Sequence, residues 1–294
     1  MILVTGTTGN FGSKAIEHLL KSGVPANNIA ALARSKESSK ALEELGINVR
    51  IGDYSDVDSL VKAFEGVDRL LLVSSSDRGD IGNRTAHHIN AITAAKKANV
   101  NRIVYTAFIR KDDHKNSAIA AFQDSHQKSE NFLKESGIPY TILQNGIYQE
   151  MILAFMGENV AEKGMIFFPA QNGKASWVLR DELAEAAAKV IIGEGHENKT
   201  YSLSNGKSEG FEQIASYLSK SLNKGIMYHS PESKDYMNML KENGLPESIA
   251  DMLVMWGKAI AENSLNLEEG DLESILGRKP KTVQEFIHNI YANS

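Results

Sequence analysis

Short apolar runs alternate with amphipathic stretches along the first half of the chain. The predicted strands lie at 1–5, 29–33, 48–51, 69–73, 102–106 and 140–144. Predicted helices lie between them at 13–22, 38–45, 57–64, 84–98 and 122–135. Near-continuous apolar strands are typical of a parallel sheet that helices cover on both faces. The pattern therefore predicts an α/β fold with a doubly wound parallel sheet of six strands.

The rhythm changes after residue 148. Short strand candidates lie around Ile166, at 200–204 and at 226–229, and longer helices are expected at 181–192 and 211–222. A methionine-rich block at 236–256 is either an adaptable apolar wall over a flat substrate or ordinary core. A capping box at 282–285 predicts a terminal helix that reaches about Tyr291. We therefore predict a sheet domain over 1–148 and a smaller mixed α/β domain over 149–294.

The first apolar run breaks into a glycine-rich loop that leads into an amphipathic helix. The loop consists of Gly6, Thr7, Thr8, Gly9, Asn10, Phe11 and Gly12. Its glycines let the chain turn tightly and let a pyrophosphate approach the start of the helix, where unpaired N–H groups favour an anion. The position between a strand and a helix favours a Rossmann-type dinucleotide site over a turn without a ligand.

Polar residues follow the second, third and fourth predicted strands. Arg34 stands where NAD-binding folds place an acidic residue, so it favours NADP(H), whose 2′-phosphate a guanidinium can bind. Asp53 either accepts a hydrogen bond from the adenine amino group or begins the turn into the next helix. Ser74, Ser75 and Ser76 end the fourth strand, at the edge where open α/β sheets bind ligands.

Composition removes several other classes of function. The 294 residues carry a formal net charge of -5 without clustered Lys or Arg, which argues against nucleic-acid binding. The absence of cysteine excludes disulfides, thiolate metal sites and thiol nucleophiles, and fits a reducing cytoplasm. We expect neither a signal sequence nor a membrane-spanning segment. His87 and His88 are adjacent rather than one helical turn apart, so we expect them on the surface or in packing rather than at a metal.

Several blocks in the same order resemble one family across essentially the whole chain. They are 6–12, Arg34, 52–54, 71–76, His126 with Glu130, 142–150, 173–174 with 180–181, and 244–246 with 251–253. The sequence is similar to the NmrA-like atypical short-chain dehydrogenase/reductases. The resemblance implies NADP(H) as cofactor, Arg34 on its 2′-phosphate and the three serines beside it. It also implies a segment near the nicotinamide and the substrate cleft, made of Asn145, Gly146, Ile147, Tyr148, Gln149 and Glu150.

Two positions depart from the family pattern. Gln144 stands where the strand usually ends in arginine, and Asn131 replaces a common lysine after Ser129 and Glu130. Both departures change charges that the resemblance places in the substrate cleft. The substrate preference is therefore open, and the second domain is expected to form that cleft.

The proton donor of ordinary short-chain dehydrogenases is missing. No tyrosine is followed by a lysine four residues later, although that pair normally protonates the alkoxide. A quinone is electrophilic and becomes aromatic on reduction, so hydride transfer to it requires positioning more than a strong acid. The resemblance thus implies an NADPH-dependent quinone reductase that uses no flavin. Protons would come from water, Tyr148 or His126, and Tyr148 would contact the substrate. The alternative for His126 is a hydrogen-bonded structural role.

A second interpretation is a redox sensor that binds NADP(H) without turnover, since some NmrA-like proteins regulate rather than catalyse. Both interpretations need the same cofactor site, so the motifs do not separate them. A small-molecule quinone is the partner expected of the enzyme. The sequence indicates neither the natural quinone nor the oligomeric state.

Overall fold

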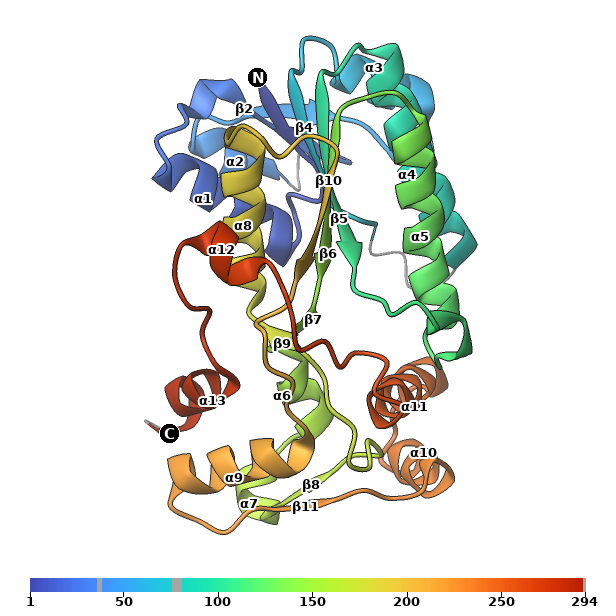
Figure 1. Ribbon diagram of the computed structural model, residues 1–294, viewed down its shortest axis with the longest axis vertical. Helices are drawn as coiled ribbons and strands as arrows, with labels where there is room; N and C mark the ends of the chain where they lie inside the picture. Colours follow the sequence, from blue (N-terminus) through green and yellow to red (C-terminus); the bar gives the residue numbers. More distant parts are fainter. Residues whose placement is uncertain (36–38, 76–80, 293–294) are drawn as a thin grey trace.

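The computed structural model describes residues 1–35, 39–75 and 81–292. In this part of the chain seven parallel strands form one sheet in the order β10-β6-β5-β4-β1-β2-β3 (Figure 1). They are β1 (Ile2–Val4), β2 (Ile29–Ala33), β3 (Asn48–Ile51), β4 (Arg69–Leu72), β5 (Arg102–Phe108), β6 (Tyr140–Asn145) and β10 (Lys199–Leu203). The sheet is doubly wound, as predicted, because the chain runs outward from β1 to β3 on one side and from β4 to β6 on the other.

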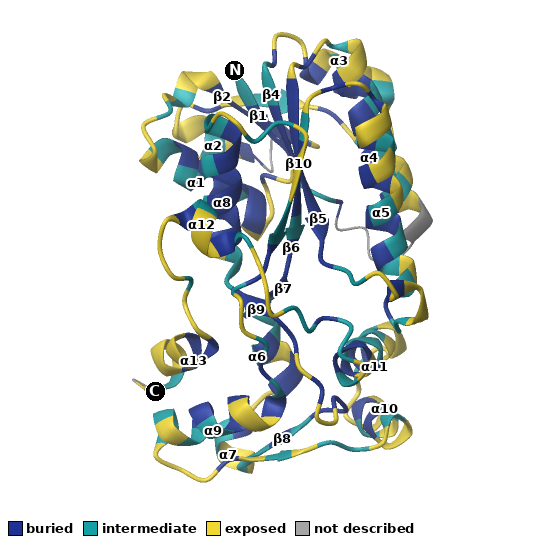
Figure 2. Ribbon diagram, in the orientation of Figure 1, coloured by how far each residue is buried: buried dark blue, intermediate teal, exposed yellow. Residues whose placement is uncertain are grey.

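Helices cover both faces of the sheet (Figure 1). One face carries α1 (Asn10–Lys21), α2 (Lys40–Glu44), α8 (Arg180–Ile192) and α12 (Leu272–Leu276), and the other carries α3 (Val57–Ala63), α4 (Ile81–Lys97) and α5 (Ala120–Glu135). Strand residues such as Leu3 and Val4 are fully buried, since a helical layer lies on each side. Figure 2 shows the result as mostly dark-blue inner strands between helices whose outward faces are exposed. This burial explains the near-continuous apolar runs.

The seventh strand corrects the sequence-based prediction of six. β10 pairs in parallel with β6, with Thr200 opposite Ile142 and Leu203 opposite Asn145. It comes from the half of the chain assigned to the C-terminal domain, as does α8, which packs against α1. The hydrophobic pattern located the strand but carries no information about the sheet that it joins. Lys199 and Thr200 are exposed, as is common for an edge strand.

The remaining elements form a smaller part beyond the carboxyl ends of the strands (Figure 1). They are β7 (Ile147–Tyr148), α6 (Met151–Met156), α7 (Val160–Lys163), β8 (Met165–Phe167), β9 (Trp177–Val178), α9 (Phe211–Leu222), β11 (Met227–His229), α10 (Ser233–Glu242), α11 (Glu247–Ala261) and α13 (Val283–Tyr291). Its core is aromatic: the rings of Phe155 and Phe211 contact each other, and each also contacts Phe168 and Trp177. Several residues of the methionine-rich block, on α10 and α11, pack against this core. The capping box at Thr282 and Glu285 is present and begins α13.

The strand order creates one place suited to a ligand. β1 lies between β2 and β4, and the chain leaves these strands in opposite directions. Loops at the carboxyl ends of the strands therefore separate at this point and leave room between them, which is where open α/β sheets bind ligands. Across the described ranges, no helix combines the length and the apolar character needed to cross a membrane.

Candidate functional site

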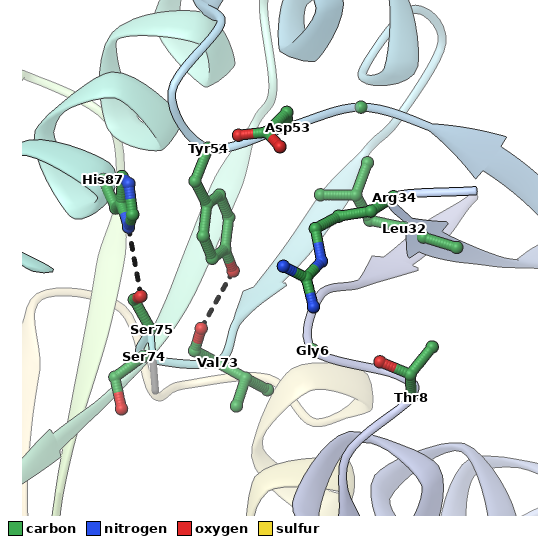
Figure 3. A pocket seen from close by; sticks show the side chains of 12 residues that line it. Gly6, Thr8, Leu32, Arg34, Asp53, Tyr54, Val73, Ser74, Ser75 and His87 are labelled. Atoms are coloured by element: carbon green, nitrogen blue, oxygen red, sulfur yellow. Dashed lines mark hydrogen bonds between the residues drawn. The ribbon is translucent and has the colours of Figure 1, made fainter. Parts of the chain in front are cut away.

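A cavity of about 560 Å³ lies at the carboxyl ends of β1 to β4 (Figure 3). Its walls are formed by Gly6, Thr8, Leu32, Ala33, Arg34, Gly52, Asp53, Tyr54, Val73, Ser74, Ser75 and His87. Six of these, Gly6, Thr8, Arg34, Asp53, Ser74 and Ser75, are residues that the sequence predicted for a cofactor. The structure thus brings together side chains from the glycine loop and from the ends of β2, β3 and β4.

The glycine loop is shaped by close backbone contacts. Gly6 has a φ of +62°, a conformation that side-chain-bearing residues rarely adopt. A Cβ on Gly12 would lie 2.4 Å from the carbonyl oxygen of Gly6, so α1 packs against the loop at a distance that requires glycine. Gly9 is the N-cap of α1, and glycine has no side chain that could cap the free N–H groups. The start of α1 is therefore left open to an anion.

Two other loop residues point into the protein rather than toward the cavity. Thr7 is buried and its hydroxyl donates a hydrogen bond of 2.9 Å to the carbonyl of Leu32. Phe11, the second residue of α1, is buried in the core. They hold the loop in place, whereas Thr8 and Asn10 are exposed. Of the loop residues predicted for the cofactor site, Gly6 and Thr8 line the cavity directly.

Arg34 is exposed at the cavity wall, and Figure 3 shows its guanidinium reaching over the space in front of Gly6. Asp53 lies in the same wall, but its Oδ1 accepts hydrogen bonds from the amide and the hydroxyl of Ser55 at 2.7 and 2.6 Å. These bonds hold the pKa of the Asp53 carboxyl below its usual range. The geometry is that of a turn-forming aspartate, which supports the second of the two roles considered for Asp53.

The sequence analysis did not identify Tyr54 and His87 as site residues. The Tyr54 hydroxyl donates to the carbonyl of Val73 at 2.9 Å, and burial raises its pKa. His87 Nδ1 lies 3.1 Å from the Ser75 hydroxyl, as drawn in Figure 3. Tyr54 follows Asp53 directly and could have been included on that ground. His87 gave no such signal, because its role depends on where α4 passes the end of β4.

The backbone of the serine segment is held from behind. The Ser74 amide donates to Thr106 Oγ1 and the Ser75 amide donates to His88 Nε2, each at 2.9 Å. Ser76 lies outside the described residues. Burial lowers the pKa of His88 to about 3, so its ring is neutral near pH 7. Since Nε2 accepts from an amide, the proton of the ring is on Nδ1, which faces Ser129 Oγ at 2.9 Å.

The walls of this cavity include no residue from Asn145 to Glu150, and most of this segment serves to hold the chain together. Gly146 packs so closely that a Cβ would lie 2.9 Å from the carbonyl oxygen of Ser176, and Ile147 is buried. Gln149 donates to the carbonyl of Lys281 at 3.0 Å, and Glu150 accepts from the Arg180 amide. These contacts hold the segment that follows β6 against Ser176, Arg180 and Lys281.

Asn145 and Tyr148 differ from their neighbours. Asn145 is buried, and its Oδ1 has no hydrogen-bond partner among the described residues. Tyr148 is half-buried, with the Arg180 guanidinium 4.7 Å from the centre of its ring. Burial raises the pKa of Tyr148, so its hydroxyl keeps its proton near neutral pH. Both residues retain polar groups that a bound molecule could use.

His126 is enclosed. It is 1% exposed, its Nδ1 lies 2.8 Å from the Tyr105 hydroxyl and its Nε2 lies 2.9 Å from Arg84 Nη2. A guanidinium can only donate, so Nε2 accepts and the imidazole is neutral with its proton on Nδ1. Burial, reinforced by the charge of Arg84, holds its pKa well below the usual range. The structure therefore places His126 behind Arg84, with both ring nitrogens engaged.

The two departures from the family pattern have different settings. Gln144 Nε2 donates to Glu130, whose side chain is fully buried and accepts two hydrogen bonds from Arg110. Gln144 thus adds a neutral donor to a buried ion pair. Asn131 is exposed on the outer side of α5. In the described ranges there is no group of three or more His, Asp or Glu side chains placed to hold a metal ion.

Comparison with known proteins gives full-length matches. The NmrA-like family model matches residues 1–287. Quinone oxidoreductase 2 of Escherichia coli strain K12 is 36% identical over 291 residues, which is 99% of each chain. The crystal structure of the E. coli NADPH-dependent quinone oxidoreductase with NADPH has a TM-score of 0.90 at 36% identity and covers 99% of this chain and 100% of that one. Triphenylmethane reductase of Citrobacter sp., complexed with NADP(H), has a TM-score of 0.92 at 34% identity, over 98% of this chain and 99% of that one.

These relatives match the present chain from the glycine loop to α13. The match includes both the sheet and the C-terminal part, so it covers the cavity and everything that surrounds it. With the strand order and the glycine loop described above, it leads to one conclusion. The chain belongs to the NmrA-like family.

Proposed function

We infer that this protein is an NADPH-dependent quinone reductase that transfers hydride without a flavin. The observation that carries the inference is the cavity at the strand ends, in which the glycine loop and Arg34 face a common space. Support comes from the E. coli quinone oxidoreductase, which is similar over the full length and whose structure contains NADPH.

The residues that form the cavity fit NADP(H). The close approach of Gly12 to Gly6 and the uncapped start of α1 suit a pyrophosphate. Arg34 takes the place of the acidic residue that would bind a free ribose 2′-hydroxyl, so it suits the 2′-phosphate. Ser74 and Ser75 continue the wall from there, beside the predicted cofactor position. When bound, NADPH supplies the hydride.

We assign Asn145 and Tyr148 to the nicotinamide end of the cofactor site. The Oδ1 of Asn145 is an acceptor without a partner in the described structure, and the Tyr148 hydroxyl is a protonated donor. Tyr148 can therefore donate a hydrogen bond to a quinone oxygen. His126 holds Arg84 in place through Nε2, and in this proposal it acts through that residue rather than as the proton source.

The experiment is NADPH oxidation by the purified, flavin-free protein with 1,4-benzoquinone, compared with NADH under the same conditions. We expect saturable turnover that prefers NADPH and does not increase when flavin is added. Turnover that requires added flavin would contradict the proposed chemistry. Bound NADPH without turnover for a series of benzoquinones and naphthoquinones would contradict the quinone assignment.

A further inference from the structure

Arg84 on α4 is a buried cation that has no counter-ion among the residues that the structure describes. Its side chain is 9% exposed, and no carboxylate in the described part of the chain forms an ion pair with it. Arg110 differs, since it pairs with the buried Glu130. Enclosing a guanidinium costs free energy that a nearby anion normally offsets. Within the described ranges, the structure provides no such anion for Arg84.

The contacts of Arg84 hold it in position but leave its charge uncompensated. Nη2 donates to His126 Nε2 at 2.9 Å and to the Ser74 hydroxyl at 3.3 Å, and both acceptors are neutral. The Phe122 ring lies 4.5 Å from the centre of the guanidinium. Nε is buried and has no hydrogen-bond partner in the described part of the chain. Tyr105 in turn fixes His126, so the orientation of the guanidinium is set from behind.

The position of Arg84 links the cofactor cavity with the C-terminal part. Ser74 is in the cavity wall, and in Figure 3 its hydroxyl points away from His87, whereas that of Ser75 points toward it. On the other side, Phe122 contacts Trp256 of α11 with ring centres 5.9 Å apart. Burial has the larger effect on the pKa of Tyr148 and raises it, whereas the charges of Arg180 and Arg84 lower it. Arg84 thus lies between the polar cavity wall and the aromatic side chains that lead to α11.

We propose that Arg84 stabilises the oxyanion formed on the quinone when it accepts a hydride, a role that rests on the proposed function. In that step the C4–H bond of the dihydronicotinamide breaks and an O–H bond forms at one quinone oxygen. The electron pair displaced through the ring ends on the other oxygen as an anion. The reaction oxidises NADPH to NADP⁺, and water supplies the second proton of the hydroquinone. An unpaired guanidinium is suited to this charge, which exists only after transfer has begun.

The test compares Arg84→Met, which removes the charge, with Arg84→Lys, which keeps it. With 1,4-benzoquinone we expect kcat to fall by about 100-fold in Arg84→Met and to be partly restored in Arg84→Lys. The dissociation constant for NADPH should change little in either variant, which also shows that both are folded. Arg34→Ala is the matched control, because it should weaken NADPH binding and leave the stabilisation of the quinone oxyanion intact.

The second measurement reports the charge directly. 4-Nitrophenol is added to protein saturated with NADP⁺, and its visible absorbance is followed against pH. The wild type and Arg84→Lys should lower the pKa of the bound phenol, and Arg84→Met should not. Three outcomes would each overturn the role of Arg84. They are a phenol titration in Arg84→Met that matches the wild type, a kcat of Arg84→Met within twofold of the wild type, and equal impairment of the Met and Lys variants. Arg84-dependent binding of the phenolate by a protein that reduces no quinone would instead contradict the proposed function alone.

Discussion

Thr7 and Leu32 join the glycine loop to the strand that carries Arg34. The Thr7 hydroxyl donates to the Leu32 carbonyl at 2.9 Å, and both residues are buried. The loop assigned to the pyrophosphate and the arginine assigned to the 2′-phosphate are therefore held in register by one hydrogen bond. Two groups expected to bind different parts of one ligand gain affinity when their spacing is fixed in advance.

Replacing Thr7 by valine should remove this connection while keeping the side-chain volume. We expect the free energy of unfolding to fall by about 1 kcal/mol, because the Leu32 carbonyl loses its donor, and NADPH binding to weaken. Urea unfolding and a fluorescence titration with NADPH measure the two effects. Thr8→Val is the control, since Thr8 is exposed and should leave stability unchanged. Equal stability of the Thr7 and Thr8 variants would contradict the structural role of Thr7.

Gly12→Ala tests the close packing of α1 on the loop. The added Cβ would lie 2.4 Å from the Gly6 carbonyl oxygen and 2.9 Å from that of Thr5, so the helix must shift. We expect a loss of about 2 kcal/mol in stability and weaker NADPH binding. Gly225→Ala is the matched control, because no atom lies within 4 Å of its added Cβ. If the two variants behaved alike, the close approach would have no energetic importance.

Arg34→Ala tests the choice of cofactor. The substitution removes the partner proposed for the 2′-phosphate and leaves the glycine loop intact, so KM should rise by about tenfold or more for NADPH and change little for NADH. The ratio of kcat/KM for the two cofactors measures this directly. A parallel loss for both would show that Arg34 does not read the 2′-phosphate.

Tyr148→Phe tests the substrate contact. Removing the hydroxyl should raise KM for the quinone several-fold, by roughly 1 kcal/mol of lost hydrogen bonding, without changing the dissociation constant for NADPH. Because burial raises the Tyr148 pKa, no loss of activity from its ionisation is expected between pH 7 and about pH 10. Unchanged quinone affinity and turnover would remove Tyr148 from the site.

His88 links stability to pH. Its pKa is about 3 in the folded protein, whereas an exposed histidine in the unfolded chain has a pKa of about 6.5. Unfolding therefore takes up a proton between these two values, so stability is full above about pH 6.5 and falls as the pH is lowered, by at most about 1.4 kcal/mol per pH unit for this group. His88→Gln should reduce that slope in urea unfolding between pH 4.5 and 7. His126 is also neutral in the folded protein, so part of the slope should remain in this variant.

Local pattern was enough to predict much of the sheet. The strand at 29–33 has the predicted bounds, because an apolar run between helical periodicities defines it without reference to the rest of the chain. The strand at 48–51 also has the predicted bounds, although it is only half apolar. The place of Lys199–Leu203 next to β6 depends on pairing over a long sequence separation, which residue periodicity does not encode. This strand was predicted as an element but assigned to the wrong part of the fold.

The site divides in the same way. Gly6, Thr8 and Arg34 could be predicted because a loop after a strand and a residue at a strand end have fixed positions in the fold. Gly146 and Gln149 belong to a block that looks functional, yet in the structure their contacts are with Ser176 and Lys281. Arg84 had no local signal at all. Arg84 is notable because no carboxylate among the described residues pairs with it, and only the three-dimensional arrangement reveals that.

The pairing of β10 with β6 has a consequence for any attempt to isolate the cofactor half of the protein. A fragment ending at residue 148 would lack both β10 and α8, so one edge of the sheet and the apolar residues of α1 that meet α8 would be exposed to solvent. A long unpaired strand beside an uncovered apolar layer is a template for association between chains. Such a fragment should aggregate. During synthesis the sheet can be completed only after the chain has been made as far as β10.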